Sequence, residues 1–490
     1  MPPRKKKQTS AVDLLWKAVD LLRGSMDAAQ YKITLLTLLY LRHLPAESTD
    51  GEDATAPPTV TWWRTFRERI SAHPDEAVAV LDELVQELTS ARPDLKNIVA
   101  PAWSVMGGLA PQQVKDLVLL LDRAPDEAGT TPAELATLYT SFTTWFAEAE
   151  GKKGGEYYTP TTVARLLVEL LGPISGRLYD PCCGIGGTLV EATRSVTANG
   201  GDPHTNLTIH GQEVNETTWR LARMHLAMNG LGTAGVHLAD TFAQDCSPAL
   251  KADVVLAHPP FNLSDWARDE ADPRWRYGAP PRANANFAWL QHAVHKLNDS
   301  GSAAVVLANG SMSSKAHGEA AIRAAMVEDD LVACIVALPG QLFRSTQIPA
   351  CVWIVAKSKS SGGGRGMTDR RGQTLFIDAR SLGVMVDRGH RALTDDDVSR
   401  IAGAYRAWRG TGAAPHRYSD VPGFCRSVDL DGIREGEYSL APGRYVGVEE
   451  PVAESAEPVQ NSIDVLTREL LDLMAQVEQG EAELRRHWFD

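Results

Sequence analysis

The tetrapeptide His258-Pro259-Pro260-Phe261 follows the apolar run ADVVLA and could act on an amino group attached to an aromatic ring. Two adjacent prolines cannot donate to a sheet ladder, so they end the strand and fix a rigid, extended turn. An amino group on an aromatic ring is a poor nucleophile because its lone pair is delocalised. Acceptors fixed at both of its N–H groups, here the His258 side chain and the Pro259 carbonyl, would free the lone pair. The tetrapeptide therefore predicts a catalytic turn.

The fourth position of this turn, Phe261, offers an aromatic ring on which a base can stack. A base that stacks on a side chain has left its own helix, so the ring predicts a nucleotide flipped out of the duplex. This chemistry requires neither a metal ion nor a covalent nucleophile, and we expect neither.

A second group of residues, in LYDPCCGIGGTLVEA, suits a bound nucleoside. Gly184, Gly186 and Gly187 allow the backbone to turn sharply into a helix and to approach a ligand closely. Their spacing is not that of the dinucleotide fingerprint, and the acid of Asp180-Pro181 would repel a pyrophosphate but attract an ammonium group. A nucleoside that carries an amino acid fits this pattern, so the loop predicts a site for S-adenosylmethionine.

Acidic residues also end the next two expected strands. Glu213, in HGQEVN, could accept hydrogen bonds from ribose hydroxyls. Asp240, in ADTF, could accept from the amino group of adenine, with Thr241 beside it and Phe242 as a packing surface. Each acid alone could be an ordinary strand-end or helix-capping residue. Three acids in consecutive loops, counting Asp180, favour a single cofactor site.

These loops need a scaffold that brings successive strand ends together. In residues 151–450, short β-rich runs alternate with helical runs, which predicts a doubly wound α/β sheet with its ligands beyond the carboxyl ends of the strands. Residues 1–150 have helical periodicity and predict a helical domain with a structural or interface role. Within the sheet region, the Gly/Ser/Arg-rich run Lys357–Gln373 predicts a solvated loop.

Residues 451–490 predict a C-terminal helix with a heptad seam, which favours contact with another subunit over a self-contained core. The seam consists of Ile463, Leu466, Leu470, Leu473, Val477, Gly480 and Leu484.

The composition is that of a globular protein with two or three domains: 490 residues, 43% hydrophobic and 23% charged. The longest apolar runs are far short of a membrane span, and we expect no signal peptide. Six cysteines without disulfide or zinc spacing indicate a reduced, cytoplasmic protein. The net charge of −13 argues against a surface that is basic throughout, so a local basic cleft or another subunit would have to hold a nucleic acid.

Together these motifs resemble the amino-methylating DNA methyltransferases, and more narrowly the modification (M) subunit of type I restriction–modification systems, an adenine-N6 methyltransferase family. LLWKAVDLLRGSMDAAQYK is similar to the N-terminal helical domain of that family, KKGGEYYTP to its cofactor motif, and NANFAWLQHAVHKL, ALPGQLFRSTQIPACVWIVAK and YSLAPGRYV to later landmarks. The resemblance implies a Rossmann-like class I methyltransferase sheet. The residues that it places at the methionine end of S-adenosylmethionine are Glu156, Tyr157, Tyr158, Thr159, Pro160, Thr161, Cys182, Cys183 and Gly184.

The same resemblance implies methylation of adenine N6 in double-stranded DNA, within a defence complex whose specificity (S) subunit sets the target sequence. The terminal helix would hold the S subunit, and a second M subunit and a restriction subunit are further candidate partners.

One residue departs from the family pattern, because His258 stands where the family has Asn. The amide oxygen of Asn accepts an amino proton of adenine. A neutral histidine accepts through one ring nitrogen and a protonated one cannot accept. Two interpretations stay open: a variant that still methylates with the proline carbonyl as main acceptor, and a catalytically weakened cofactor- and DNA-binding component of a defence complex. A third, methylation of a protein glutamine or an RNA base, is disfavoured by the helical domain and the heptad helix.

Overall fold

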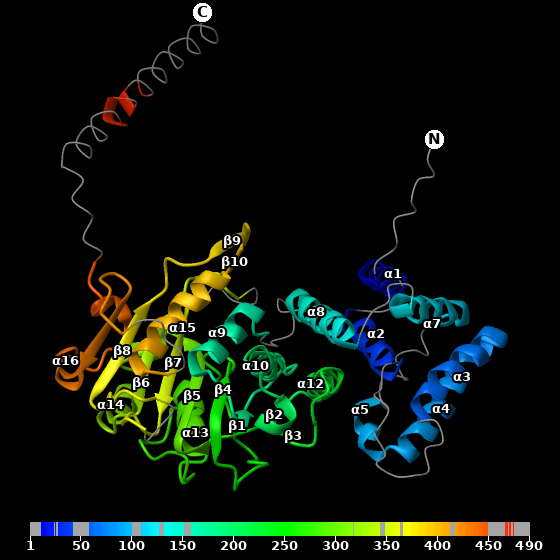
Figure 1. Ribbon diagram of the computed structural model, residues 1–490, viewed down its shortest axis with the longest axis horizontal. Helices are drawn as coiled ribbons and strands as arrows, with labels where there is room; N and C mark the ends of the chain where they lie inside the picture. Colours follow the sequence, from blue (N-terminus) through cyan, green and yellow to red (C-terminus); the bar gives the residue numbers. More distant parts are fainter. Residues whose placement is uncertain are drawn as a thin grey trace, which may run out of the picture.

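The β-rich runs of the central chain form a nine-stranded sheet, shown in the computed structural model of Figure 1. The described residues are 11–23, 25, 28–42, 58–99, 109–126, 132–150, 158–316, 318–343, 348–362, 366–411, 417–448, 466–468, 470–471 and 474. The strands are β1 (Gly176–Asp180), β2 (Leu207–Glu213), β3 (Val236–Leu238), β4 (Ala252–Ala257), β5 (Leu297–Ala308), β6 (Val332–Ala337), β7 (Ala350–Ala356), β8 (Gln373–Asp378), β9 (Val384–Asp387), β10 (His390–Ala392) and β11 (Cys425–Asp429). Every residue of β6 and β7 is buried, as expected for strands covered on both faces.

The strand order in this sheet is β11-β8-β6-β7-β5-β4-β1-β2-β3, and β9 pairs separately with β10. Strands β1 to β5 pair in parallel, so the carboxyl ends of β1 to β4 meet at one edge. β7 and β11 run antiparallel to their neighbours. The chain moves outward from β1 to β3 and then returns to β4 on the other side of β1. In doubly wound sheets, ligands bind at the carboxyl edge beside such a switch point.

Helices cover both faces of the sheet. They are α9 (Thr161–Leu171), α10 (Gly187–Ala198), α11 (Pro203–Asn206), α12 (Glu216–Met228), α13 (Asn286–Lys296), α14 (Glu319–Glu328), α15 (Asp395–Arg409) and α16 (Leu430–Glu435). Alternate strand residues point to opposite faces, so Leu178 and Val254 pack with α9, α10 and α15, while Tyr179 and Val255 pack with α13 and α14. The doubly wound α/β sheet that the sequence predicts is confirmed.

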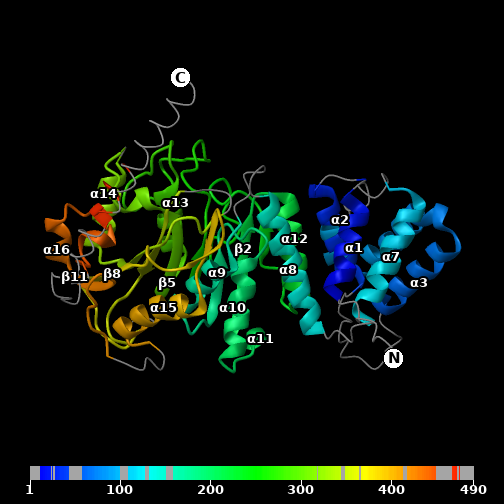
Figure 2. The same ribbon diagram turned by 90° about the horizontal axis from the view of Figure 1, so that it is seen from above.

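Helices account for the N-terminal elements that the structure describes: α1 (Ala11–Arg23), α2 (Ala28–Arg42), α3 (Pro58–Ala72), α4 (Ala77–Ala91), α5 (Lys96–Val99), α7 (Pro111–Asp126) and α8 (Pro132–Glu150). They lie beside α12 at the β3 end of the sheet (Figures 1 and 2). α12 is buried on two sides: Trp219 and Leu226 join the sheet core, whereas Leu221 and Met224 join the core of the N-terminal helices. The predicted helical domain is confirmed, whereas the domain boundaries at residues 150 and 450 stay predictions.

The segment Lys357–Gln373 differs from the solvated loop that its composition predicts. The Lys359 ammonium is buried, 2.5 Å from an Asp330 carboxylate oxygen, and donates to the carbonyls of Val332 and Gln373. The loop prediction was wrong for this residue, because distant acceptors compensate the charge that local composition assigned to solvent.

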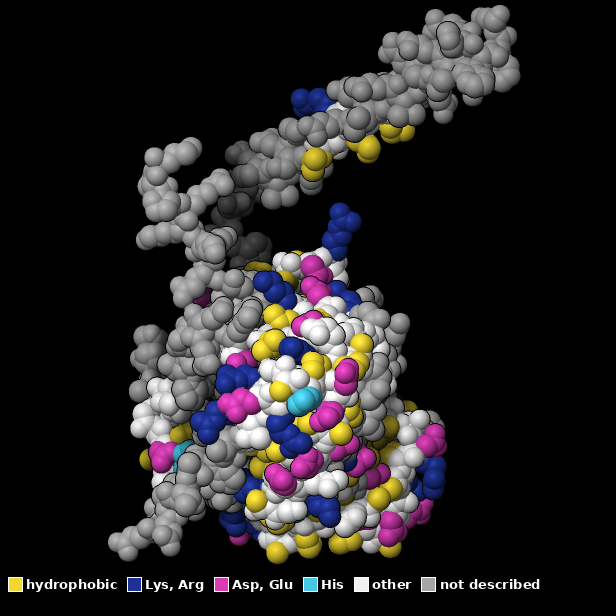
Figure 3. Space-filling view, turned by 90° about the vertical axis from the view of Figure 1, so that its right-hand side faces the viewer, with side chains coloured by type: hydrophobic (Ala, Val, Ile, Leu, Met, Phe, Trp, Pro, Cys, Tyr) yellow, Lys and Arg dark blue, Asp and Glu magenta, His cyan; other side chains and the backbone are white. Residues whose placement is uncertain are grey.

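Surface charge is mixed where the N-terminal helices face the viewer in Figure 3, with Lys and Arg side chains interleaved among Asp and Glu. The described residues therefore make no continuous basic sleeve on this face. No helix in the described part of the chain is long and apolar enough to cross a membrane.

Candidate active site

A cavity of about 410 Å³ lies at the carboxyl edge of the sheet, beside the switch point. The loops that follow β1, β2, β3 and β4 all contribute to its walls, which confirms that the predicted motif loops lie at strand ends. The lining residues are Pro181, Cys182, Gly184, Glu213, Val214, Asn215, Thr218, Ala239, Asp240, Thr241, His258, Pro260, Leu263, Ser264, Asp265, Trp266 and Trp289.

Asp180, at the end of β1, supports its own loop and does not line the cavity. Its buried carboxylate accepts hydrogen bonds from the Cys182 backbone N–H (3.0 Å) and the Thr188 hydroxyl (2.5 Å). Gly184 and Gly186 adopt positive φ values of 54° and 78°, which favour glycine, and the chain then enters α10. The acid therefore fixes the turn that presents the Cys182 and Gly184 backbone to a ligand.

Burial raises the pKa of Asp180 from 3.8 to about 6, although the bonds from Thr188 and Cys182 oppose this shift. Between these values the folded chain holds a proton that the unfolded chain has lost, so the free energy of unfolding falls as the pH rises. We expect a change from pH 5 to pH 7 to cost about 1 kcal/mol through this carboxyl. The asparagine of Asp180→Asn does not titrate. From pH 5 to pH 7 the free energy of unfolding of wild type should therefore fall by about 1 kcal/mol more than that of the variant, which urea unfolding at both pH values measures. Equal pH dependence in the two proteins would contradict the assignment.

Glu213, at the end of β2, faces both the cavity and the glycine loop. One carboxylate oxygen accepts from the Gly184 N–H (3.0 Å) and the other from the Asn215 N–H (2.8 Å). The side chain also lines the cavity, where a carboxylate can accept hydrogen bonds from a ligand. The acid therefore links the β1 and β2 loops around the cavity.

The β3 loop carries Asp240 and Thr241 to the same cavity. An Asp240 oxygen accepts from the Phe242 N–H (2.8 Å), and the Thr241 hydroxyl donates to the Pro181 carbonyl (2.5 Å). Phe242 does not line the cavity, because its ring packs behind the wall, 4.3 Å from the Trp289 ring centroid. The aromatic walls are instead Trp266 and Trp289, which sequence reasoning did not assign to the site.

Arg274 anchors the β3 loop and was also not predicted. Its guanidinium donates to the carbonyls of Thr241 (2.7 Å) and Phe242 (2.9 Å) and pairs with the Asp272 carboxylate (2.5 Å). The local run DPRW contains both members of the ion pair, but nothing in it indicates the two carbonyl partners, which lie 33 and 32 residues earlier in the chain.

The tetrapeptide turn after β4 is fixed by a pair of asparagines. Asn262 adopts a positive φ of 54°, and its N–H donates to the Asn286 side-chain oxygen (3.1 Å). The Asn286 amide in turn donates to the Asn262 side-chain oxygen (2.9 Å). Asn286 begins α13 within NANFAWL, so this landmark holds the turn in place.

His258 lines the cavity and is 5% exposed. Its Nδ1 lies 2.8 Å from the Thr159 hydroxyl oxygen, and its Nε2 has no hydrogen-bond partner among the described residues. Burial lowers the pKa of this imidazole to about 3, so the ring is neutral at physiological pH. Phe261 is buried against it rather than exposed to the cavity: His258 contacts the rings of Phe261 (5.3 Å) and Phe343 (4.9 Å).

The other predicted residues lie around this group. Pro160 precedes the first residue of α9, Thr161, whose hydroxyl lies 3.3 Å from that of Tyr158. Burial raises the pKa of the Cys182 and Cys183 thiols well above their usual value, so both stay protonated. Those that do not line the cavity are Tyr158, Thr159, Pro160, Thr161, Asp180, Cys183, Gly186, Gly187, Pro259 and Phe261, and Glu156 and Tyr157 lie outside the described residues.

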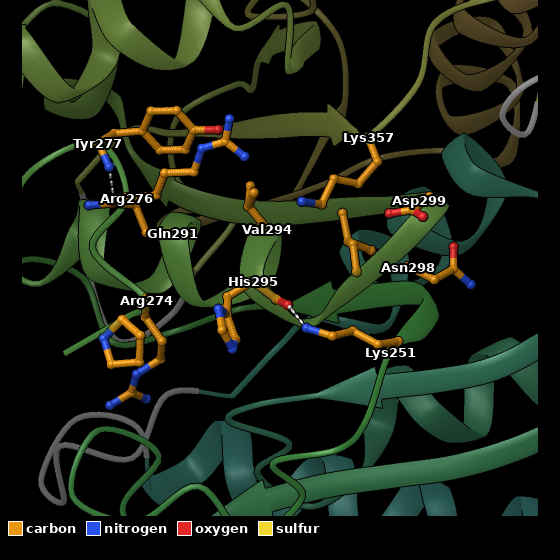
Figure 4. A pocket seen from close by; sticks show the side chains of 12 residues that line it. Lys251, Arg274, Arg276, Tyr277, Gln291, Val294, His295, Asn298, Asp299 and Lys357 are labelled. Atoms are coloured by element: carbon orange, nitrogen blue, oxygen red, sulfur yellow. Dashed lines mark hydrogen bonds between the residues drawn. The ribbon is translucent and has the colours of Figure 1, made fainter.

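A second cavity of about 410 Å³ opens among Lys251, Arg276, His295 and Lys357, near the start of β5 (Figure 4). The Lys251 ammonium donates to the His295 carbonyl (2.9 Å) there. None of the predicted site residues lines it.

Two protein families match the chain. The family described as N-6 DNA Methylase matches residues 132–454, and the HsdM N-terminal domain matches residues 12–122. The HindI methylase subunit of a type I restriction enzyme, from Haemophilus influenzae, is 43% identical over 72% of this chain and 77% of its own length. The MjaIX methylase subunit from Methanocaldococcus jannaschii is 29% identical over 95% of this chain and 88% of its own length.

A solved structure shows the same fold. It is the methyltransferase subunit of a type I restriction–modification system from Streptococcus thermophilus, with a TM-score of 0.71 and 24% identity, over 90% of this chain and 100% of that one. The sequence matches extend through both the helical and the sheet regions. The chain therefore belongs to the N-6 DNA methylase family and is an adenine-specific DNA methyltransferase, a methylase subunit of the type I restriction–modification kind.

Proposed function

We propose that this subunit binds S-adenosylmethionine in the cavity at the switch point and methylates N6 of an adenine flipped out of double-stranded DNA. One observation carries the proposal: the cavity joins the acids Glu213 and Asp240 to His258 and Pro260 of the tetrapeptide turn. The two acids suit the hydroxyl and amino donors of a nucleoside, and the His258 side chain suits one N–H of a planar amine. Pro259, whose carbonyl would be the second acceptor, stands between the lining residues His258 and Pro260.

The cavity residues fit the nucleoside part of S-adenosylmethionine. Glu213 lines the cavity, where its carboxylate would accept from ribose hydroxyls, and Asp240 lines it at the next strand end for the adenine amino group. The indoles of Trp266 and Trp289 supply aromatic walls, and Trp289 Nε1 has no hydrogen-bond partner among the described residues. When bound, this cofactor supplies an activated methyl group, while the protein groups hold and orient it.

The tetrapeptide turn would prepare the target amine. A neutral His258 can accept one N–H of adenine through a ring nitrogen, and the Pro259 carbonyl can accept the other. With both N–H groups held, the nitrogen lone pair is directed at the methyl group rather than delocalised over the base. Stacking of the base on Phe261 would require its contacts with His258 and Phe343 to open.

Glu213→Ala should weaken S-adenosylmethionine binding about tenfold to hundredfold, because hydrogen bonds to a charged acceptor contribute about 1.5–3 kcal/mol. The variant loses the ribose acceptor and the anchors of two backbone N–H groups. Titration calorimetry measures the affinity. The matched control is Glu216→Ala, an exposed acid of α12 paired with Arg220, which should bind as wild type. Wild-type affinity in the Glu213 variant would remove the acid from the site.

We also propose that the C-terminal helix is the contact for the specificity subunit. Leu466 and Leu470 are helical and exposed, whereas the other seam residues, Ile463, Leu473, Val477, Gly480 and Leu484, lie outside the described residues. Exposed leucines at heptad spacing suit burial against a partner helix. A second M subunit and a restriction subunit stay proposals.

Truncation after Pro458 should leave a folded chain that no longer co-purifies with the specificity subunit. Circular dichroism checks the fold and affinity co-purification checks the contact. Undiminished co-purification of a folded, truncated chain would place the contact elsewhere.

A further inference from the structure

His258 poses a chemical problem that Asn does not. An Asn side chain carries a distinct carbonyl oxygen, so its acceptor is fixed by covalent structure. A neutral imidazole has one nitrogen that donates and one that accepts, and the two can exchange roles. A histidine that must accept from a substrate therefore needs a neighbour that decides which nitrogen bears the proton.

Thr159 is the described residue whose hydrogen bond reaches this ring. Its hydroxyl oxygen lies 2.8 Å from His258 Nδ1, across 99 residues of sequence. The other ring contacts are apolar, with Phe261 and Phe343, and the low pKa of the imidazole results from burial. No charged group among its described contacts competes with Thr159 for control of the ring.

The burial of Nε2 favours one of the two neutral tautomers of the His258 ring, those with the proton on Nδ1 or on Nε2. The Nε2 atom is enclosed and has no hydrogen-bond partner among the described residues, so adenine would reach it only when the contacts of the ring with Phe261 and Phe343 open. A buried N–H without an acceptor is rarer in folded proteins than a buried acceptor with an unused lone pair. The form with the proton on Nδ1, donated to the Thr159 oxygen, leaves Nε2 with a lone pair and is the less costly one.

We propose that Thr159 is a positioning residue that keeps the His258 proton on Nδ1, so that Nε2 accepts from the amino group of adenine. This inference rests on the proposed function, in which His258 is the first acceptor. It differs from the cofactor contact that the family resemblance implies for Thr159. The Thr159 hydroxyl thus determines which ring nitrogen accepts, whereas in Asn the acceptor is always the side-chain carbonyl oxygen.

The test compares Thr159→Val, which removes the hydroxyl at nearly constant shape, with Thr159→Ser, which retains it. In the full chain with its specificity subunit, we expect Thr159→Val to lower kcat about tenfold to hundredfold, the range found when a metal-bound histidine loses the partner that orients it. Thr159→Ser should recover most of the rate. The affinity for S-adenosylmethionine should stay unchanged in both variants, whereas weaker binding with unchanged kcat would overturn the proposal in favour of a cofactor contact.

Two further measurements separate positioning from general damage. Nitrogen-15 spectra of the histidine-labelled chain, with the His258 signals assigned by their loss in His258→Asn, should show protonated Nδ1 in wild type and in Thr159→Ser. Protonated Nε2 in wild type would overturn the proposal. In the His258→Asn background, adding Thr159→Val should change kcat far less than it does beside His258, and an equal loss in both backgrounds would also overturn it. A wild-type rate in His258→Ala would exclude His258 as an acceptor and overturn the proposal, whereas an absence of adenine methylation in both wild type and His258→Asn would refute the proposed function itself.

Discussion

Replacing His258 with alanine is expected to lower the rate of methyl transfer about 10²- to 10³-fold, the usual cost of losing one preorganised hydrogen-bonding group. The side chain lines the cavity beside the acids of the cofactor site and is neutral at physiological pH. Its removal leaves the Pro259 carbonyl as the remaining acceptor of the turn. The rate is measured as transfer of labelled methyl groups to duplex DNA in the presence of the specificity subunit.

The matched variant is His258→Asn, which restores the residue of the family pattern. Activity in wild type and in His258→Asn, with loss in His258→Ala, is the expected result. Activity in His258→Asn alone would show that the native chain is the catalytically weakened component that the sequence left open. Equal activity in all three proteins would exclude His258 as an acceptor.

Arg274→Met is expected to lower the free energy of unfolding by about 3–5 kcal/mol, because it leaves a largely buried carboxylate without its partner. Asp272 would lose its ion pair, and the carbonyls of Thr241 and Phe242 would lose their donors. Since these carbonyls belong to the loop that carries Asp240, S-adenosylmethionine binding should weaken as well. Urea unfolding and calorimetry measure the two effects.

The neighbouring Arg276 provides the control for this prediction. Its side chain is 66% exposed, and it pairs with Asp329 at 3.2 Å. Exposed ion pairs contribute about 0–1 kcal/mol, so Arg276→Met should change stability little. An equally small change in both variants would mean that Arg274 acts as an ordinary surface charge rather than as the anchor of the loop.

The sequence was sufficient to predict those site residues whose place in the sheet follows from the local strand pattern. Asp180 and Glu213 end the parallel strands β1 and β2, and the prolines after His258 stop β4, so strand periodicity alone places all three at one edge. The direction of each side chain was not available from that pattern. Asp180 faces its own turn, and Phe261 packs inside an aromatic group, because loop hydrogen bonds and packing decide orientation.

Residues that act through distant partners were beyond the reach of sequence patterns. The Thr159–His258 contact spans 99 residues, and the Lys359 ammonium finds its acceptors at Asp330 and Val332. Such contacts depend on which loops the folded sheet brings together. The composition of a Gly/Ser-rich run does not reveal them. Arg274 and the indole walls belong to the same class of long-range features.

The most direct test of the central claim is a map of N6-methyladenine in DNA from cells that express this chain with its specificity subunit. Sequencing that detects the modified base, compared between wild type and His258→Ala, supplies the map. We predict methylated adenines within one recurring sequence for wild type and their loss in the variant. Unmodified adenines in cells with the wild-type pair, while His258→Asn methylates, would contradict this prediction.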